Sequence, residues 1–249
     1  MRTIAVSGKG GTGKSTLSAL IIRWLRKNRS QSILAVDADS NVNLNDLLGV
    51  AVKETVGSIR EEMRKSIDQI PGGMTKQAFL EYKIHTSLVE TPDFDLIAMG
   101  RPEGPGCYCY ANNLLRDILK TLSHNYQYVI IDNEAGMEHL SRRTAHNIDS
   151  LLIVSDPSIR GVRAAGRINR LLTELSTRVG ERHLILNRVR ESVPEVLLQA
   201  ASEEAMHLLG TVPEDDQLHR IDQTGESVWN IPEDAEIYQA VDTFIKKLL

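Results

Sequence analysis

The stretch that decides the fold lies near the start of the chain and reads Gly8-Lys9-Gly10-Gly11-Thr12-Gly13-Lys14-Ser15. Its spacing, G-x-x-x-x-G-K-S, is that of a phosphate-binding loop. In such a loop the glycines let backbone N–H groups turn toward phosphate oxygens, and the following helix adds its positive N-terminal end. Lys14 is expected to reach the β- and γ-phosphates, and the Ser15 hydroxyl is expected to bind Mg²⁺. The residues expected to contact nucleotide here are Gly8, Gly10, Gly11, Thr12, Gly13, Lys14, Ser15 and Thr16.

The residues around this loop favour that interpretation over a chance match in a glycine-rich turn. An apolar run at 3–7 predicts a buried strand before the loop, and an apolar-periodic helix is predicted over about 15–27. Further strands are predicted at 32–37, 95–99, 128–132, 150–154 and 183–187, and helices at about 55–67, 111–123, 159–177 and 232–249. Continuous apolar strands separated by helices predict an α/β fold. We expect a mainly parallel sheet covered by helices on both faces, in one P-loop domain over 1–249.

Composition limits what the chain can do. It has 249 residues, of which 41% are hydrophobic and 25% charged, and its formal net charge is −4. This balance is ordinary for a globular protein and gives no sign of nucleic-acid binding driven by bulk charge. No apolar run approaches the ~20 residues that span a bilayer, and the first residues do not resemble a signal peptide. We expect a cytoplasmic protein that binds neither nucleic acid nor membrane.

Carboxylates stand at the ends of two predicted strands. Asp37 and Asp39 end the second strand, and Asp132 ends the strand at 128–132. In an open α/β sheet the ligand lies at the carboxyl ends of the strands. Asp132 is therefore expected to hold Mg²⁺, directly or through water. Both positions have an ordinary structural alternative, because Asp is also common at helix N-caps and in turns.

The segment Asn187-Arg188-Val189-Arg190 follows the last predicted strand, where P-loop GTPases carry Asn-Lys-x-Asp. Arg190 stands in place of the guanine-reading Asp, and a guanidinium cannot accept the N–H donors of guanine. Adenine is therefore favoured as the base. We expect Asn187 to bond the base edge and Arg188 to belong to the same nucleotide site.

The two cysteines of the chain are Cys107 and Cys109, one residue apart after a loop rich in glycine and proline. In an extended segment residues i and i+2 face the same side, so both thiolates could grip one metal ion. Two thiolates do not complete a tetrahedral site, whereas a two-fold dimer would supply four. We predict a Ni²⁺ or Zn²⁺ site shared across a dimer. The alternative is a pair of inert buried thiols.

Lys9 is a second lysine inside the loop and completes the pattern G-K-G-G-x-G-K-S-T. This pattern resembles the deviant Walker A motif of the dimeric ATPases that include MinD, ParA, nitrogenase iron protein and ArsA. The resemblance implies a homodimer with two ATP molecules between the subunits, in which Lys9 reaches the partner's nucleotide. It also implies that Asp39 positions or activates the attacking water, although Ser40 replaces the usual proline of that family. Lys9, Lys14 and Asp39 are thus the expected catalytic residues.

Two later segments carry the same resemblance. The run from Asp132 to Gly136 looks like the second switch of these ATPases, which implies that the N–H of Gly136 meets the γ-phosphate. The segment 210–215, Gly-Thr-Val-Pro-Glu-Asp, resembles the family's G-x-[IV]-P-x-[DE] segment. That segment closes the adenine pocket, which implies that Pro213 lies beside the base.

The combination of the loop, the C-x-C pair and the run NEAGMEHLSRRT at 133–144 resembles the CooC family of nickel-insertion ATPases. These ATPases serve carbon monoxide dehydrogenase and acetyl-CoA synthase. The sequences at 37–41 and 133–136 look closer to those of the acetyl-CoA synthase branch, AcsF. The resemblance implies ATP and ADP, Mg²⁺, and Ni²⁺ or Zn²⁺ as ligands, and one of the two nickel enzymes as client. His139 is either a metal ligand or, as we favour, a residue facing the dimer seam or a switch.

Two other classes remain open. A positioning ATPase of the MinD/ParA kind would act on membrane or DNA, but the predicted final helix is acidic where a membrane-surface helix should be basic. An electron-transfer ATPase with a bridging iron–sulfur cluster, as in nitrogenase iron protein, also uses two cysteines per subunit. Those cysteines lie well apart in sequence, unlike Cys107 and Cys109.

Overall fold

A computed structural model describes residues 1–29, 31–65, 73–101, 122–134, 148–174 and 179–249. The strands are β1 (Arg2–Gly8), β2 (Ile33–Ala38), β3 (Val89–Glu90), β4 (Asp95–Ala98), β5 (Tyr128–Asn133), β6 (Ile148–Ser155), β7 (Val179–Val189) and β8 (His207–Pro213). The helices are α1 (Lys14–Arg29), α2 (Leu44–Leu48), α3 (Val56–Lys65), α4 (Lys76–Ser87), α7 (Ile159–Glu174), α8 (Glu195–Glu203), α9 (Asp216–Thr224) and α10 (Glu236–Leu248). Short 3-10 turns stand at η2 (Ser123–Asn125) and η3 (Val228–Asn230).

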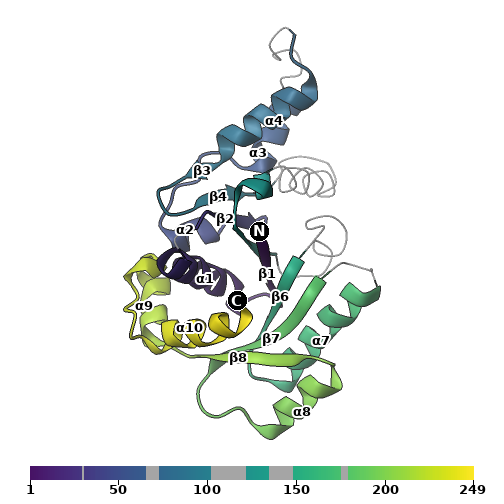
Figure 1. The fold of residues 1–249 in the computed structure, drawn as a ribbon, viewed down its shortest axis with the longest axis vertical. Coiled ribbons are helices and arrows are strands. Elements are labelled where there is room, and N and C mark those ends of the chain that lie inside the picture. Colours follow the sequence, from purple (N-terminus) through teal and green to yellow (C-terminus); the bar gives the residue numbers. More distant parts are fainter. Residues whose placement is uncertain (30, 66–72, 102–121, 135–147, 175–178) are drawn as a thin grey trace.

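The strands form one eight-stranded sheet in the order β3-β4-β2-β5-β1-β6-β7-β8 (Figure 1). Each pair of neighbours is parallel except β3 and β4, which form a short antiparallel edge. Parallel neighbours need crossover helices, which is why the strands alternate with helices along the chain. The predicted α/β fold with a mainly parallel sheet is confirmed.

Successive strand residues alternate between two cores. In β1, Ile4 and Val6 pack against one face of the sheet with α1, α9 and α10, while Ala5 packs against the other with α3, α7 and α8. Both faces are therefore buried, which explains why the strands are apolar at nearly every position. The expected cover of helices on both faces is confirmed.

The observed elements differ from the predicted ones mainly at their ends. Helix α10 begins at Glu236, not at 232, and α3 ends at residue 65 within the described part of the chain. Helices α2, α4, α8 and α9 and strands β3 and β8 were not predicted. The predicted helix over 111–123 lies almost wholly outside the described residues.

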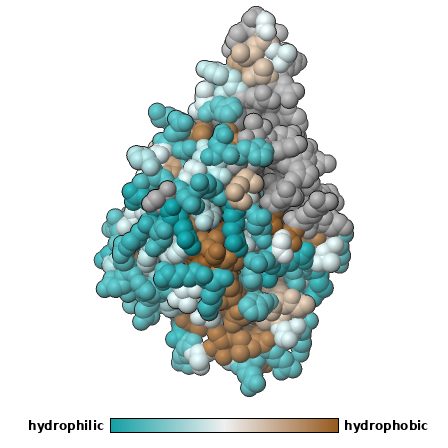
Figure 2. Space-filling model, in the orientation of Figure 1, coloured by the Kyte–Doolittle hydropathy of each residue, from teal (hydrophilic) through white to brown (hydrophobic). Residues whose placement is uncertain are grey.

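The surface matches this layered arrangement. Figure 2 shows hydrophilic side chains over much of the face in view, with apolar ones gathered in its lower half. Helix α8 lies at the lower end of the molecule (Figure 1). It carries the exposed side chains of Val196 and Leu198. Among the described helices, none is long and apolar enough to cross a membrane.

Candidate functional site

The phosphate-binding loop connects β1 to α1 at the carboxyl edge of the sheet. Three of its glycines have positive φ, at 152° for Gly8, 77° for Gly11 and 88° for Gly13. Gly8 pairs with Val154 across β1 and β6, and a Cβ on Gly8 would lie 2.3 Å from the Val154 carbonyl oxygen. The loop therefore turns where only glycine fits.

The carbonyl oxygen of Lys9 accepts several hydrogen bonds from within the loop. It accepts hydrogen bonds from the Thr12 hydroxyl at 2.9 Å and from the Thr12 N–H at 3.4 Å. The ammonium of Lys14 also donates to it, at 3.4 Å, and the Lys14 residue is only 8% exposed. A long bond to a neutral carbonyl is weaker than one to a phosphate oxygen, so Lys14 is held inside the loop and free to turn to a bound anion. Lys9 itself is exposed.

Asn187, at the end of β7, holds this loop from the side. Its Nδ2 donates to the Thr12 carbonyl at 2.8 Å, and its Oδ1 accepts the N–H of Arg188 at 2.9 Å. Asn187 is 6% exposed, and a Cβ on Gly13 would lie 2.3 Å from its Nδ2. The predicted bond from Asn187 to a base edge stays a prediction. Its contact with the loop was not foreseen, because nothing local links residues so far apart in sequence.

Asp132 lies at the end of β5, paired with Val6 of β1 and Asp37 of β2. Asp132 is 1% exposed, and its Oδ1 accepts a hydrogen bond from the Ser18 hydroxyl at 3.3 Å. Burial, with the nearby Asp37 adding to it, raises the pKa of Asp132, while the hydroxyls of Ser15 and Ser18 and the charge of Lys14 oppose the rise, and the resulting pKa is about 7.

One oxygen of this carboxylate, Oδ2, has no hydrogen-bond partner within the described part of the chain. A buried carboxylate with an unpaired oxygen beside the Ser15 hydroxyl is the donor set that a hard divalent cation prefers. These residues therefore fit Mg²⁺. The cation would also remove the cost of burying the charge on Asp132.

Asp37 organises the loop after β2. It is fully buried, and its carboxylate accepts the backbone N–H groups of Asp39 at 3.0 Å, Asn43 at 2.9 Å and Leu44 at 3.0 Å. Burial raises the pKa of Asp37, and the three N–H donors oppose that rise. Asp39 is partly exposed, and its Oδ1 accepts the N–H of Asn41 at 2.8 Å. The loop thus holds Asp39 at the edge that also carries the phosphate-binding loop.

The loops after β2 and β5 touch each other. The Ser40 hydroxyl donates to Oε1 of Glu134 at 3.1 Å. Between them, the buried Asn133 fixes the end of β5, because its Nδ2 donates to the Val6 carbonyl at 2.9 Å. The loop after β2 carries Asp39 and the loop after β5 begins the predicted second switch; we call them the two switch loops, and their contact was not predicted.

The two segments of the predicted adenine pocket are brought together by the sheet. Asn187 pairs with Val212, and Val189 pairs with Pro213, across β7 and β8. Arg190 forms an ion pair with Glu214, which raises the pKa of the first group and lowers that of the second. Arg188 is exposed, and its backbone has a positive φ of 61°. The roles of Arg188 and Pro213 toward a base stay predictions.

Several predicted site residues lie outside the described residues. They are Cys107, Cys109, Gly136 and His139. Within the ranges that the structure describes, no group of three or more His, Cys, Asp or Glu side chains is arranged to hold a metal ion. The predicted Ni²⁺ or Zn²⁺ site therefore stays a prediction.

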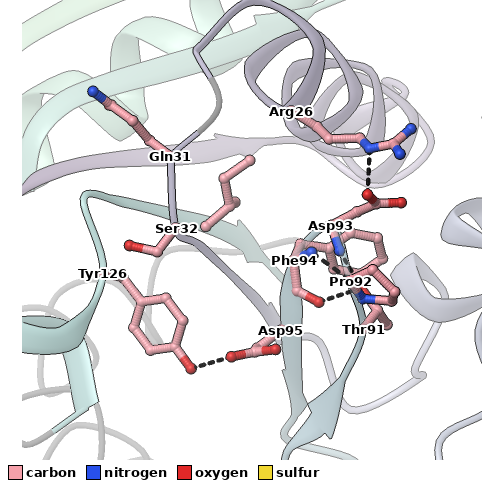
Figure 3. Close-up of a pocket in the computed structure, with 10 residues that line it drawn as sticks. Arg26, Gln31, Ser32, Thr91, Pro92, Asp93, Phe94, Asp95 and Tyr126 are labelled. Atoms are coloured by element: carbon pink, nitrogen blue, oxygen red, sulfur yellow. Dashed lines mark hydrogen bonds and ion pairs between the residues drawn. The ribbon is translucent and has the colours of Figure 1, made fainter.

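A separate pocket of about 460 Å³ lies where β2 and β4 begin, at the opposite edge of the sheet from the phosphate-binding loop (Figure 3). The Tyr126 hydroxyl donates to Asp95 at 2.5 Å, and Arg26 pairs with Asp93 at 2.6 Å. Burial, with Asp95 adding to it, raises the pKa of Tyr126. Both carboxylates already have partners, and none of the predicted site residues lines this pocket.

Comparison with known proteins agrees with the geometry of the phosphate-binding edge. An uncharacterized ATP-binding protein of Methanocaldococcus jannaschii is 45% identical over 248 residues, which cover 99% of this chain and 98% of that protein. The carbon monoxide dehydrogenase accessory protein CooC of Rhodospirillum rubrum is 28% identical over 239 residues, which cover 92% of this chain and 89% of that protein.

Solved structures share the fold. The septum site-determining protein MinD of Pyrococcus horikoshii, solved with Mg-ADP, matches with a TM-score of 0.69 at 21% identity, over 99% of this chain and 95% of that one. The family model for the CobQ/CobB/MinD/ParA nucleotide binding domain matches residues 3–228. This chain therefore belongs to the CobQ/CobB/MinD/ParA family of nucleotide-binding P-loop proteins.

Proposed function

We propose that this protein is an ATP-dependent nickel-insertion metallochaperone for carbon monoxide dehydrogenase or acetyl-CoA synthase. The observation that carries the ATPase part is the buried carboxylate of Asp132 beside Ser15 and Lys14, with one oxygen unpaired. The metallochaperone part rests on Cys107 and Cys109, and it is supported by the similarity to the CooC protein of R. rubrum.

In the proposed hydrolysis, ATP and water give ADP and phosphate. Mg²⁺ bound by Ser15 and Asp132 would neutralise charge on the β- and γ-phosphates. Lys14 leaves the Lys9 carbonyl for the phosphate oxygens, and the turned glycines supply backbone N–H donors. Asp39 orients the attacking water, held in place by the loop that Asp37 organises. The arginine at 190, paired with Glu214, favours adenine over guanine.

In the proposed metal cycle, Ni²⁺ is cargo. Each chain offers the two thiolates of Cys107 and Cys109, and a homodimer offers four, enough for one tetrahedral or square-planar site. Lys9 is exposed on the phosphate-binding loop and is proposed to reach the partner's nucleotide, so that ATP closes the dimer. Loss of the γ-phosphate would then release the two switch loops and weaken the binding of the metal.

One observation weighs against the membrane-positioning alternative. The apolar face of α10 is already buried in this chain: Ile237, Val241, Phe244, Ile245 and Leu248 are each at most 4% exposed. This face packs against α1 and β8. The helix would have to leave the core to offer its apolar side chains to a lipid surface, at a cost of several kcal/mol.

The proposal is tested by metal transfer between purified proteins under anaerobic conditions. The Ni²⁺-loaded protein is mixed with nickel-free acetyl-CoA synthase or carbon monoxide dehydrogenase, with ATP or with a non-hydrolysable ATP analogue. Activation of one client that needs both ATP hydrolysis and the cysteines supports the proposal. Equal activation by wild-type protein and by the Cys107→Ala/Cys109→Ala variant would refute it.

A further inference from the structure

Helix α7 carries four arginines on one face. They are Arg160, Arg163, Arg167 and Arg170, and all four residues are exposed. Their spacing of three, four and three residues places them within an arc of about 80° on a helix of 3.6 residues per turn, along about 15 Å of its axis. The opposite face of the helix packs on the sheet through Val162, Ala165, Ile168 and Leu172. We call these four arginines the α7 arginine stripe.

Most of the stripe has no ion-pair partner among the residues that the structure describes. Arg170 pairs with Glu204, whereas Arg160, Arg163 and Arg167 form no ion pair with any described residue. An ordinary solvated helix face mixes both signs of charge. Helix α9 does so with Asp216, Arg220 and Asp222, but α7 has no acidic residue before Glu174. Four like charges in a row repel one another, so a chain with net charge −4 keeps them at a cost unless an anionic surface covers them.

The carboxylates of the neighbouring helix α8 limit which kind of anionic surface can bind the stripe. Helix α8 packs beside α7 (Figure 1). It carries exposed Glu195 and Glu203, with Glu204 just after it, and it contains no Lys or Arg. A DNA duplex carries about one charge per 1.7 Å of its axis. Because the duplex is wider than a helix, its phosphates would also lie close to those carboxylates and be repelled by them. A single acidic helix is narrow enough to meet α7 alone, and carboxylates at three- and four-residue spacing match the stripe.

We propose that the α7 arginine stripe is a docking surface for an acidic helix of a protein partner. The proposal takes the identity of that partner, a nickel enzyme, from the proposed function. Helix α7 begins four residues after β6, whose Val154 faces Gly8 of the phosphate-binding loop. Its first turn is fixed closely to β6, because a Cβ on Gly161 would lie 2.5 Å from Oγ of Ser155. A partner docked on the stripe would therefore lie next to the nucleotide edge.

The test compares two charge-reversal variants that change net charge equally. Arg163→Glu/Arg167→Glu alters the middle of the stripe. Lys53→Glu/Arg220→Glu is the control, because both residues are exposed and neither forms an ion pair among the described residues. ATP hydrolysis is measured first and is expected to be unchanged in both, since none of the four residues belongs to the nucleotide site.

Binding is then measured by titration at low and high salt with five purified probes. They are the two nickel-free client enzymes, a helical peptide with four Glu at spacing three, four and three, an isomer of that peptide with the Glu residues scattered around the helix, and a DNA duplex. The stripe variant is expected to bind the client and the patterned peptide at least about tenfold more weakly than wild type, while the control binds as wild type does. Stripe-dependent binding of the patterned peptide without any client binding would still support the docking surface, while it would count against the proposed function.

Three results would overturn the inference. One is unchanged client and peptide binding by the stripe variant. Another is absence of binding of client and patterned peptide alike by the wild type at low salt. The third is stripe-dependent binding of the DNA duplex in preference to the patterned peptide, since the surface would then serve a different class of partner.

Discussion

The Ser40 hydroxyl donates a 3.1 Å hydrogen bond to Oε1 of Glu134 and so joins two loops 94 residues apart in the chain. The first loop carries Asp39, the residue proposed to orient water, and the second follows Asp132, the residue proposed to hold Mg²⁺. The bond therefore connects the two halves of the proposed catalytic arrangement. Serine at this position supplies a donor that the proline usual in similar ATPases lacks.

Replacing this serine is expected to slow hydrolysis more than it weakens binding. A part-buried hydrogen bond contributes about 0.5–1.5 kcal/mol, which corresponds to roughly a 2- to 13-fold lower kcat for Ser40→Ala. The KM for ATP should change little, because Ser40 is assigned to loop alignment and not to the phosphates. Ser40→Thr keeps the hydroxyl and should restore most of the rate in steady-state assays. Equal rates for the Ala and Thr variants, whether high or low, would contradict a role for the bond.

Two glycines of the phosphate-binding loop make a matched pair for stability measurements. Gly13 and Gly11 both have positive φ, so alanine strains the backbone at either position. Only at Gly13 does the added Cβ meet an atom, Nδ2 of Asn187 at 2.3 Å, whereas at Gly11 nothing lies within 4 Å. Gly13→Ala should therefore lower the free energy of unfolding by about 1–3 kcal/mol more than Gly11→Ala, as followed by urea titration. Equal losses would show that Asn187 does not hold the loop.

The raised pKa of Asp132, about 7, predicts how the stability of the nucleotide-free protein changes with pH. Since the folded protein favours the protonated carboxyl, this group lowers stability as pH rises from about 4 toward 7, and the loss is complete above that. Asp132→Asn is neutral at every pH. It should match the wild type near pH 4 and be more stable by on the order of 2–4 kcal/mol at pH 8.

The matching measurement is urea unfolding of both proteins across that pH range, with and without Mg²⁺ and ATP. The ligands should reduce the advantage of Asp132→Asn at pH 8, because they stabilise the charged carboxylate of the wild type alone. The variant should also have lost most hydrolysis. A stability difference that is independent of pH would show that the buried carboxylate is ionised without cost.

Variants of Asp39 and Lys14 should distinguish ATP binding from ATP hydrolysis. Asp39→Ala is expected to keep ATP affinity within a few-fold and to lose at least about 100-fold in kcat, since it removes the group that orients water. Lys14→Ala should lose both affinity and turnover, because the lysine contacts the phosphates. Fluorescent-nucleotide titration and phosphate release measure the two properties. An Asp39→Ala protein that fails to bind ATP would reassign this residue to the loop structure.

The strands that place the site were predictable because their sequences are locally unambiguous. Runs such as 33–37 and 128–132 are apolar throughout and end in Asp, which is typical of parallel strands buried on both faces with polar residues at the carboxyl edge. The elements that sequence reasoning missed have weaker patterns. Helix α8 exposes Val196 and Leu198, which blurs its periodicity, and β8 contains Gly210, whose missing side chain makes room for Phe244.

In the candidate site, too, some features were predictable from local sequence and others were not. The loop at 8–15 and Asp132 could be recognised from local spacing. The contact of Asn187 with Thr12 and the bond between Ser40 and Glu134 depend on long-range pairing, which no local pattern encodes. Asp37 is an intermediate case, because its bonds to the N–H groups of Asp39, Asn43 and Leu44 are local. An aspartate at a strand end, followed by a polar turn, was a usable signal for this role.

Metal stoichiometry tests the central claim most directly. Each chain supplies only the thiolates of Cys107 and Cys109, and a thiolate site for Ni²⁺ or Zn²⁺ needs four. Anaerobic titration with Ni²⁺ or Zn²⁺, with the oligomer mass measured alongside and ATP present or absent, should therefore give one tightly bound ion per dimer. The metal alone should promote dimerisation, and Cys107→Ala or Cys109→Ala should each lose the metal yet still bind ATP. One ion per monomer, or full binding by the double cysteine variant, would contradict the shared site and the metallochaperone function built on it.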